Sequence, residues 1–142
     1  MPQTYSTELQ PTQLSPAQLP SATSGYGARL HRYRASIVLA GQASGDTVVL
    51  ANIPAGQCFA YGSLVTDTSL GTATVSVGNA SSAAKYKAAA VFTATDTPTA
   101  FGKASAIAGV PSTAQEQVLL TVGTAALPSS GSLVVDLYFS GP

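Results

Sequence analysis

Apolar and polar residues alternate from Gly45 to Gly78, and this stretch organises the pattern of the whole chain. Two connections, Pro54-Ala55-Gly56 and 67–71, divide it into three short segments. Proline suits the second position of a tight turn, and glycine tolerates the positive φ that often follows. Because alternate residues of a strand point to opposite faces, the stretch predicts three strands with one buried face and one face of serine and threonine. The alternating apolar positions are Val48, Leu50, Phe59, Tyr61, Leu64, Ala73, Val75 and Val77.

The C-terminal part of the chain repeats the alternation in residues 115–122 and 132–140. We expect Asp136 to point outward from the last of these strands. Turns with glycine and proline separate the predicted strands, a spacing typical of an antiparallel all-β domain. The predicted fold is therefore a β-sandwich, jelly-roll-like, or a small barrel. The inward positions of these two strands are predicted to be Val118, Leu120, Val122, Leu133, Val135, Leu137 and Phe139.

Residues 79–94 fit two patterns. An asparagine or serine near the start could cap a helix, which the alanine content favours, but the second half also alternates as a strand. We expect a loop or turn followed by a strand over 86–94. The aspartate, proline and glycine of 95–102 predict a loop, and 103–114 are predicted to form a connection.

Residues 1–24 differ from the predicted domain, which spans 25–142. They contain four of the nine prolines, separated mainly by glutamine, serine and threonine. Proline at this spacing disfavours helices and sheet ladders and favours extended chain. The segment is either a disordered leader or an arm that becomes ordered on a neighbouring subunit. In the second case, four apolar residues could fill shallow pockets of that subunit: Tyr5, Leu9, Leu14 and Leu19.

Arg29, Arg32 and Arg34 supply half of the basic side chains of the chain, and they lie at the start of a predicted strand. One interpretation is a solvated strand end with cross-strand partners. Another is a contact patch for an acidic surface on a partner subunit. Three arginines without further basic residues nearby give a weak field for nucleic acid, so we expect no nucleic-acid binding.

The composition favours a protein that functions within an assembly. Charged residues make up 8% of the chain, against about a quarter in an ordinary soluble domain, and the formal net charge is zero. Net charge helps a free protein to avoid association, and a neutral surface does not provide this protection. No apolar stretch is long enough for a transmembrane helix, and residues 1–4 do not resemble the start of a signal peptide. We therefore expect no membrane partner.

Candidate chemistry is sparse, because the chain has one histidine, His31, and one cysteine, Cys58. A structural zinc site needs about four such ligands, so we expect no metal. A Cys-His nucleophile pair would require these two residues, but Cys58 follows a turn in a strand of small and apolar residues, where a buried inert thiol is usual. No phosphate-binding loop or serine-nucleophile motif is present. We expect neither a cofactor nor enzymatic activity.

The order and spacing of turn and strand sequences between residues 29 and 140 form a recognisable pattern. In the first half they are Gly45–Leu50, Ile53–Gly56, Gly62, Asp67, Ser69–Gly71 and Val75–Gly78. In the second half they are Tyr86, Ala88–Ala90, Thr93, Asp96–Pro98, Phe101-Gly102, Leu119–Thr121, Ala125–Pro128 and Gly131. This pattern resembles small virion structural proteins of tailed bacteriophages, which are typically encoded close to the major capsid protein.

The resemblance implies a structural protein of the capsid decoration (cement) type, bound to the outside of the capsid. The implied partners are the major capsid protein and neighbouring copies of the chain, often as a homotrimer. The implied location is the capsid surface of the virion, after assembly in the host cytoplasm. Residues 1–24 lie outside the resembling region. From the residues themselves, we expect the capsid contacts to include Tyr5, Leu9, Leu14, Leu19, Arg29, Arg32 and Arg34.

Two other function classes remain open at this point. The first is a phage tail or fibre component that binds glycans through exposed aromatic rings. The second is a small enzyme such as a cell-wall hydrolase. The tyrosines that could supply stacking surfaces are Tyr26, Tyr33, Tyr61, Tyr86 and Tyr138, although half-buried strand tyrosines explain most of them more simply.

Overall fold

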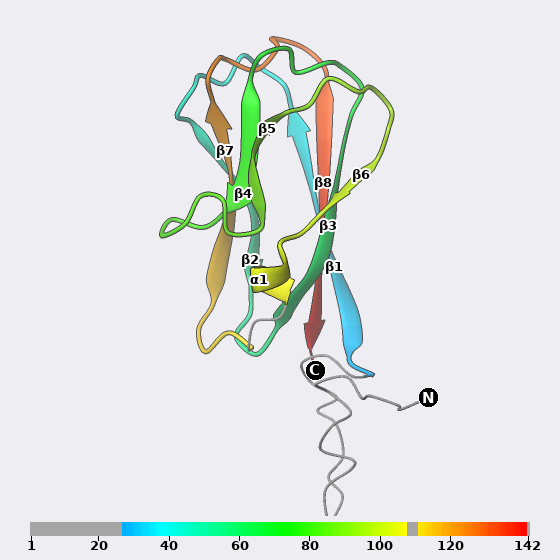
Figure 1. Ribbon diagram of the computed structural model, residues 1–142, viewed down its shortest axis with the longest axis vertical. Helices are drawn as coiled ribbons and strands as arrows, with labels where there is room; N and C mark the ends of the chain where they lie inside the picture. Colours follow the sequence, from blue (N-terminus) through cyan, green and yellow to red (C-terminus); the bar gives the residue numbers. More distant parts are fainter. Residues whose placement is uncertain (1–26, 108–110, 142) are drawn as a thin grey trace, which may run out of the picture.

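The computed structural model describes residues 27–107 and 111–141. Eight strands form two four-stranded sheets, in which every pairing is antiparallel (Figure 1). Sheet A has the order β1-β8-β3-β6, and sheet B has the order β2-β7-β4-β5. The elements are β1 (Arg29–Val38), β2 (Thr47–Ile53), β3 (Cys58–Thr66), β4 (Thr74–Gly78), β5 (Lys87–Val91), β6 (Thr99–Phe101), α1 (Ala104–Ile107), β7 (Glu116–Gly123) and β8 (Ser132–Gly141).

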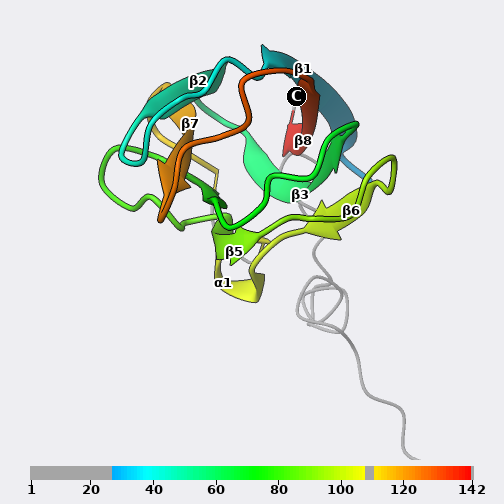
Figure 2. The same ribbon diagram turned by 90° about the horizontal axis from the view of Figure 1, so that it is seen from above.

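The strand order is that of an eight-stranded jelly roll, and the predicted all-β sandwich is confirmed. Consecutive strands β1 to β4 alternate between the two sheets, so their connections cross the sandwich. Figure 2 shows the two sheets face to face, with β1 and β2 together along one side. The three strands predicted between Gly45 and Gly78 all form, but β3 belongs to sheet A while β2 and β4 belong to sheet B.

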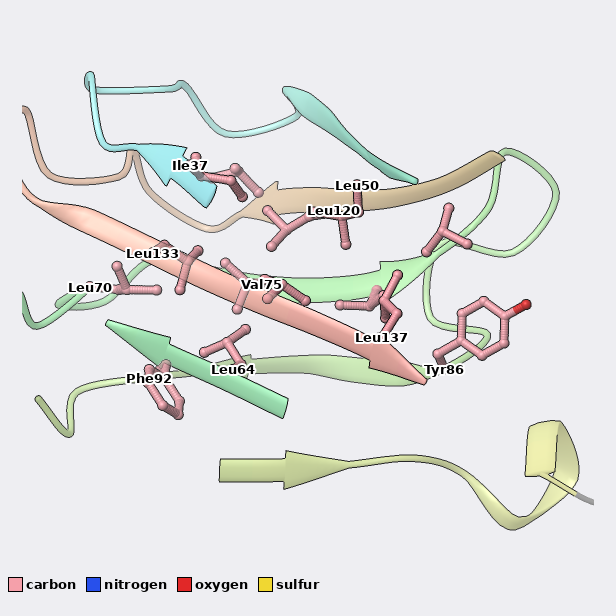
Figure 3. Close-up of a cluster of buried hydrophobic side chains, with 14 of the residues drawn as sticks. Ile37, Leu50, Leu64, Leu70, Val75, Tyr86, Phe92, Leu120, Leu133 and Leu137 are labelled. Carbon is pink, nitrogen blue, oxygen red and sulfur yellow. The ribbon is translucent and has the colours of Figure 1, made fainter. Parts of the chain in front are cut away.

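The space between the sheets is filled by apolar side chains from alternating positions (Figure 3). In β8, the four residues predicted to point inward are at most 3% exposed, and the three inward residues of β7 are at most 1% exposed. Since β8 lies between β1 and β3, its inward side chains are covered by both neighbouring strands and by sheet B. The alternation read from the sequence therefore identifies the core face of both strands.

The two predicted turns have the backbone that glycine permits. Gly56 has φ of +92° and Gly71 has φ of +66°, values that side chains with a Cβ rarely adopt. Gly56 also donates its backbone N–H to the Ser112 carbonyl at 2.7 Å, which joins the β2–β3 turn to the segment before β7. Glycine at these positions lets the chain reverse direction and cross between the sheets.

Residues 79–94, whose sequence fitted both a helix and a strand, form a turn followed by a strand, as expected. Asn79 accepts hydrogen bonds from the backbone of Ser81 and Ser82 through its side-chain oxygen, and β5 follows. The prediction of a loop over 95–102 was incomplete, because β6 forms within it. β6 is three residues long and pairs with β3 where Phe101 lies against Gly62, a contact that residue spacing does not encode.

The connections gather at the two ends of the sandwich (Figure 1). The upper end carries the connections β1–β2, β3–β4, β5–β6 and β7–β8. The lower end carries β2–β3, β4–β5 and β6–β7, with the start of β1 and the end of β8. No helix in the described ranges has the length and apolar character needed to cross a membrane.

Candidate functional site: an arginine and tyrosine face

The outward face of sheet A carries a cluster of charged and aromatic side chains. Two cross-strand rows build it: Arg32 lies opposite Tyr138, and Arg34 lies opposite Asp136. Tyr61 of β3 lies on the other side of Tyr138. These five residues are called the Arg-Tyr face below. Antiparallel register places opposite side chains about 5 Å apart, close enough for neighbouring side chains to interact.

Asp136 holds both arginines in place. The Arg34 guanidinium donates from Nε and Nη2 to the two carboxylate oxygens, each at 2.9 Å, and Arg32 Nε lies 3.4 Å from Oδ1. The Asp136 side chain is only 10% exposed, whereas those of Arg32 and Arg34 are 46% and 54% exposed. Asp136 thus points outward as predicted, but the arginines cover it. The bidentate geometry fixes the guanidinium plane of Arg34.

Hydrogen bonding to Arg34 lowers the pKa of Asp136 from its ordinary value, and the charge of Arg32 adds to this effect. Burial of the carboxyl opposes the shift. The same hydrogen bond raises the pKa of the Arg34 guanidinium. The pair is therefore ionised at neutral pH, and two arginines share one carboxylate, which leaves an excess positive charge on the face.

The sign of the Asp136 shift predicts a pH dependence of stability. Because the folded pKa is lowered, ionised Asp136 contributes stability above its unfolded pKa, and this contribution is lost as the pH falls through the folded value. We expect Asp136→Asn to cause a modest fall in the free energy of unfolding at neutral pH, since solvent screens the exposed arginines. Urea unfolding measured at decreasing pH should show wild type and variant converging in acid. A difference that stayed constant down to about pH 2 would contradict the assigned ion pair.

Tyr61 and Tyr138 stack on each other with ring centroids 4.5 Å apart and an interplanar angle of 10°. The Tyr61 residue is 42% exposed. The remaining exposed apolar side chains of β1, Leu30 and Val38, lie at the two ends of the same outward face. The face therefore combines a rigid aromatic pair, two oriented cations and scattered apolar area.

The structure brings together only some of the residues predicted to contact a partner. Arg32 and Arg34 share the Arg-Tyr face, whereas strand alternation puts Arg29 on the opposite side of β1. The other predicted contacts fall outside the described residues: Tyr5, Leu9, Leu14 and Leu19.

Of the five tyrosines considered for stacking, Tyr61 and Tyr138 form the stacked pair, in which Tyr61 is exposed and Tyr138 is half-buried. Tyr86 is buried, Tyr33 is half-buried with its hydroxyl donating to Gln57 Oε1 at 2.7 Å, and Tyr26 lies outside the described residues. The stacking of Tyr61 on Tyr138 and the ion pairs of Asp136 with the two arginines were not predicted from the sequence. The sequence contained one indication of a role for Asp136, because it is the only carboxylate in a strand of mainly apolar residues.

A second polar cluster lies at the lower end of the sandwich. Lys85 Nζ donates to Glu116 Oε2 at 2.7 Å, and the Tyr86 hydroxyl donates to Glu116 Oε1. Burial, and then the contact with Glu116, raise the pKa of Tyr86 far above its ordinary value, so the hydroxyl stays protonated and acts as a donor. These contacts attach the β4–β5 connection to the start of β7.

A cavity of about 100 Å³ lies beside this cluster, lined in part by Gln57, Cys58, Tyr86 and Ser112. It is smaller than the roughly 300 Å³ at which small-molecule pockets begin. A shallower hollow of about 430 Å³ lies between the 79–81 turn and the start of β7. Burial raises the pKa of the Cys58 thiol, which disfavours the nucleophilic thiolate. Within 27–107 and 111–141, no three His, Cys, Asp or Glu side chains are grouped to hold a metal.

No protein-family model matches the chain, and no curated protein sequence matches it. Three solved structures contain chains with a similar fold. A chain in the cyanophage Pam1 capsid asymmetric unit aligns over 100% of both chains, with 24% identity and a TM-score of 0.67. A chain in the capsid of Ralstonia phage GP4 covers 88% of this chain and 90% of its own length, with 15% identity and a TM-score of 0.64.

The third is a chain in the acid-stable capsid structure of Helicobacter pylori bacteriophage KHP30. It covers 80% of this chain and 88% of its own length, with 17% identity and a TM-score of 0.59. At these identities the comparisons establish the shared fold. The protein has a jelly-roll fold that also occurs in chains of three bacteriophage capsid structures.

Proposed function

We propose that this protein is a virion structural protein of the capsid decoration (cement) type. It binds the outside of a bacteriophage capsid, stabilises the shell and catalyses no reaction. The observation that carries the proposal is the fold match over the whole chain to a chain of one phage capsid structure, together with two further matches to phage capsids. The absence of catalytic motifs from the sequence agrees with a structural role.

The Arg-Tyr face has the properties of a protein contact surface. Tyrosine and arginine are enriched among the residues that dominate binding energy at protein interfaces. Here both types stand on adjacent strands of one sheet, and Asp136 and ring stacking already hold them in place. A partner therefore pays little conformational entropy to bind them. We assign the capsid contact to this face and to residues 1–24.

A folded domain preceded by the extended arm that the sequence predicts for residues 1–24 suits a cement function. Each additional contact made by the segment is intramolecular once the domain is bound, which raises the effective affinity. Ordering the segment costs roughly 1–2 kcal/mol per residue, so it must make many contacts to remain bound. Neighbouring copies, arranged as a homotrimer where capsid subunits meet, would place several such segments on one site.

The stacked Tyr61–Tyr138 pair also favours a second candidate, a tail or fibre component that binds glycans. Sugar rings stack on exposed aromatic faces. Each tyrosine uses one ring face against the other, which leaves less aromatic surface for a sugar. We therefore rank this function below capsid decoration. Glycan-array binding by the purified protein would favour it.

The first test is to mix purified protein with expanded capsids that lack it. We expect saturable co-sedimentation and a higher melting temperature of the capsid, because binding to the assembled shell stabilises it by mass action. Removal of residues 1–24 should then sharply reduce capsid occupancy. A full-length variant with Tyr5, Leu9, Leu14 and Leu19 changed to serine is the matched control for chain length, and it should show the same loss.

Two outcomes would count against these assignments. Unchanged occupancy after removal of residues 1–24 would contradict the role of that segment while leaving capsid decoration intact. No binding of the wild-type protein, with the protein found on tails or fibres instead, would overturn the capsid assignment and support the second candidate.

A further inference from the structure

We propose that the lower end of the sandwich, together with the adjoining Arg-Tyr face, docks onto an acidic surface of the capsid and that the upper end faces away from it. The inference deepens the proposed function and rests on it. It follows from a separation of charge along the strand axis that the topology creates.

The upper end is acidic. Of the five described carboxylates, three lie in connections at this end: Asp46 before β2, Asp67 after β3 and Asp96 between β5 and β6. All three are exposed, and no basic residue lies in the described connections of this end. The upper end therefore has a formal charge of −3.

The rest of the sandwich is basic. All six basic side chains of the protein lie between its middle and its lower end, with two carboxylates among them, which leaves an excess of four positive charges. Lys103 precedes α1, and Arg29 begins β1 at the lower end. The basic residues are Arg29, Arg32, Arg34, Lys85, Lys87 and Lys103, and the two carboxylates are Asp136 and Glu116.

The two ends act on partners separately. The ten residues of β1 span roughly 30 Å at about 3.3 Å per residue, whereas charges are screened beyond about 8 Å at physiological ionic strength. A partner at one end therefore experiences mainly the charge of that end. The described residues thus carry −3 at one end and +4 over the rest, and Glu8 brings the formal net charge of the whole chain to zero. The sandwich therefore has one acidic and one basic pole.

The basic pole is also where β1 begins, so the chain that precedes Gly27 joins the sandwich at that end. The capsid-contacting segment and the positive charge thus share one pole. Complementary charge favours an acidic partner there and orients its approach.

A second copy of this chain is a less suitable acidic partner. Contact between the acidic pole of one copy and the basic pole of the next is heterologous. Repeated along the strand axis, such a contact stacks copies end to end into filaments instead of spreading them over a shell surface. Two of the upper aspartates are also engaged within their own copy. Asp67 accepts from the backbone N–H of Ser132 at 2.8 Å, and Asp46 accepts from that of Ala43 at 2.9 Å.

Covalent labelling of free and capsid-bound protein tests the orientation directly. Acetylation followed by mass spectrometry measures the accessibility of the Lys103 amine. Carbodiimide coupling measures the accessibility of the Asp46 and Asp96 carboxylates. We expect binding to slow acetylation of Lys103 several-fold and to leave the labelling of both aspartates unchanged. Protection of the aspartates with Lys103 still reactive would overturn the inference.

Charge variants provide a second, quantitative test. We expect Arg29→Glu combined with Lys103→Glu to weaken capsid binding by about tenfold or more at low salt, with the difference shrinking at high salt. The control is Asp46→Asn with Asp96→Asn, which also alters the charge of two side chains, by +2 in total against −4 for the two glutamate substitutions. Asparagine keeps the acceptor oxygen that Asp46 uses and tolerates the φ of +52° at Asp96, so affinity should not change.

The outcomes separate the two proposals. Equal capsid binding by the wild type and both charge variants would overturn the assignment of the basic pole as the docking surface. It would leave the proposed capsid decoration function intact. Filaments formed by the protein alone at low salt, and abolished by either charge variant, would also overturn it, because the basic pole would then bind a second copy. Failure of the wild type to bind capsids at any salt concentration would overturn the proposed function itself.

Discussion

Leu137→Ala is expected to lower the free energy of unfolding by about 2–5 kcal/mol, through lost burial and the cavity that remains. Leu137 is fully buried in β8, between Tyr33 of β1 and Gly62 of β3, and faces sheet B. Neighbouring backbone is hydrogen-bonded on both sides, so the site cannot collapse easily to fill the space. Chemical denaturation monitored by circular dichroism measures the loss.

Two variants control for this result. Leu137→Met keeps the volume approximately and should cost less than about 1.5 kcal/mol. Val134→Ala removes apolar atoms from the half-buried outward face of the same strand and should also have a small effect. A Leu137→Ala loss no larger than that of Val134→Ala would show that the core is not packed as described.

Gly78→Ala should destabilise the protein by about 1–3 kcal/mol or more, as expected for overpacking against atoms that cannot move freely. A Cβ at Gly78 would lie 2.6 Å from the Ala83 carbonyl carbon and closer still to the Ser82 carbonyl oxygen. That oxygen accepts from the backbone N–H groups of Asn79 and Lys85, so the turn cannot retreat without losing hydrogen bonds. Thermal unfolding of the variant measures the effect.

The matched control is Gly71→Asn, at a position where a Cβ would meet nothing within 4 Å. Its φ of +66° is one that asparagine adopts more readily than most residues, so the cost should be small. Gly78, unlike Gly71, does not have a positive φ, so a loss for Gly78→Ala no larger than that for Gly71→Asn would contradict the close approach of the 79–86 connection to position 78. In the folded Gly78→Ala protein, Glu116 should become more accessible to carboxyl labelling, because the displaced connection carries Lys85 and Tyr86.

Local pattern was sufficient to predict most strands and their inward faces. Period-two alternation reports which side of a strand is buried, and it does so without information on the partner strand. For this reason β7 and β8 were predicted with their core residues. Assignment to sheets needs partner information, which explains why β2, β3 and β4 were placed as strands but not divided between the two sheets.

The candidate site was only partly predictable for the same reason. The arginines formed a visible cluster in sequence, but Asp136 is separated from Arg34 by 102 residues and becomes its neighbour only through the β1–β8 register. The Tyr61–Tyr138 pair likewise depends on register, and a bulge in β3 between Phe59 and Tyr61 sets which residues lie opposite β8. The two charged poles could not be predicted from composition. Several charged residues lie in connections between strands, and only the topology determines at which end of the sandwich each connection lies.

The pairing of β1 with β8 has a consequence for synthesis on the ribosome. Arg29 pairs with Gly141, so the first described strand cannot gain its only sheet neighbour until more than a hundred further residues have been made. A nascent chain carries an unpaired strand edge throughout that time, and such edges promote association with other chains. Folding of this domain is therefore expected to be largely post-translational, and we expect aggregation to begin where several nascent chains lie close together on one polysome.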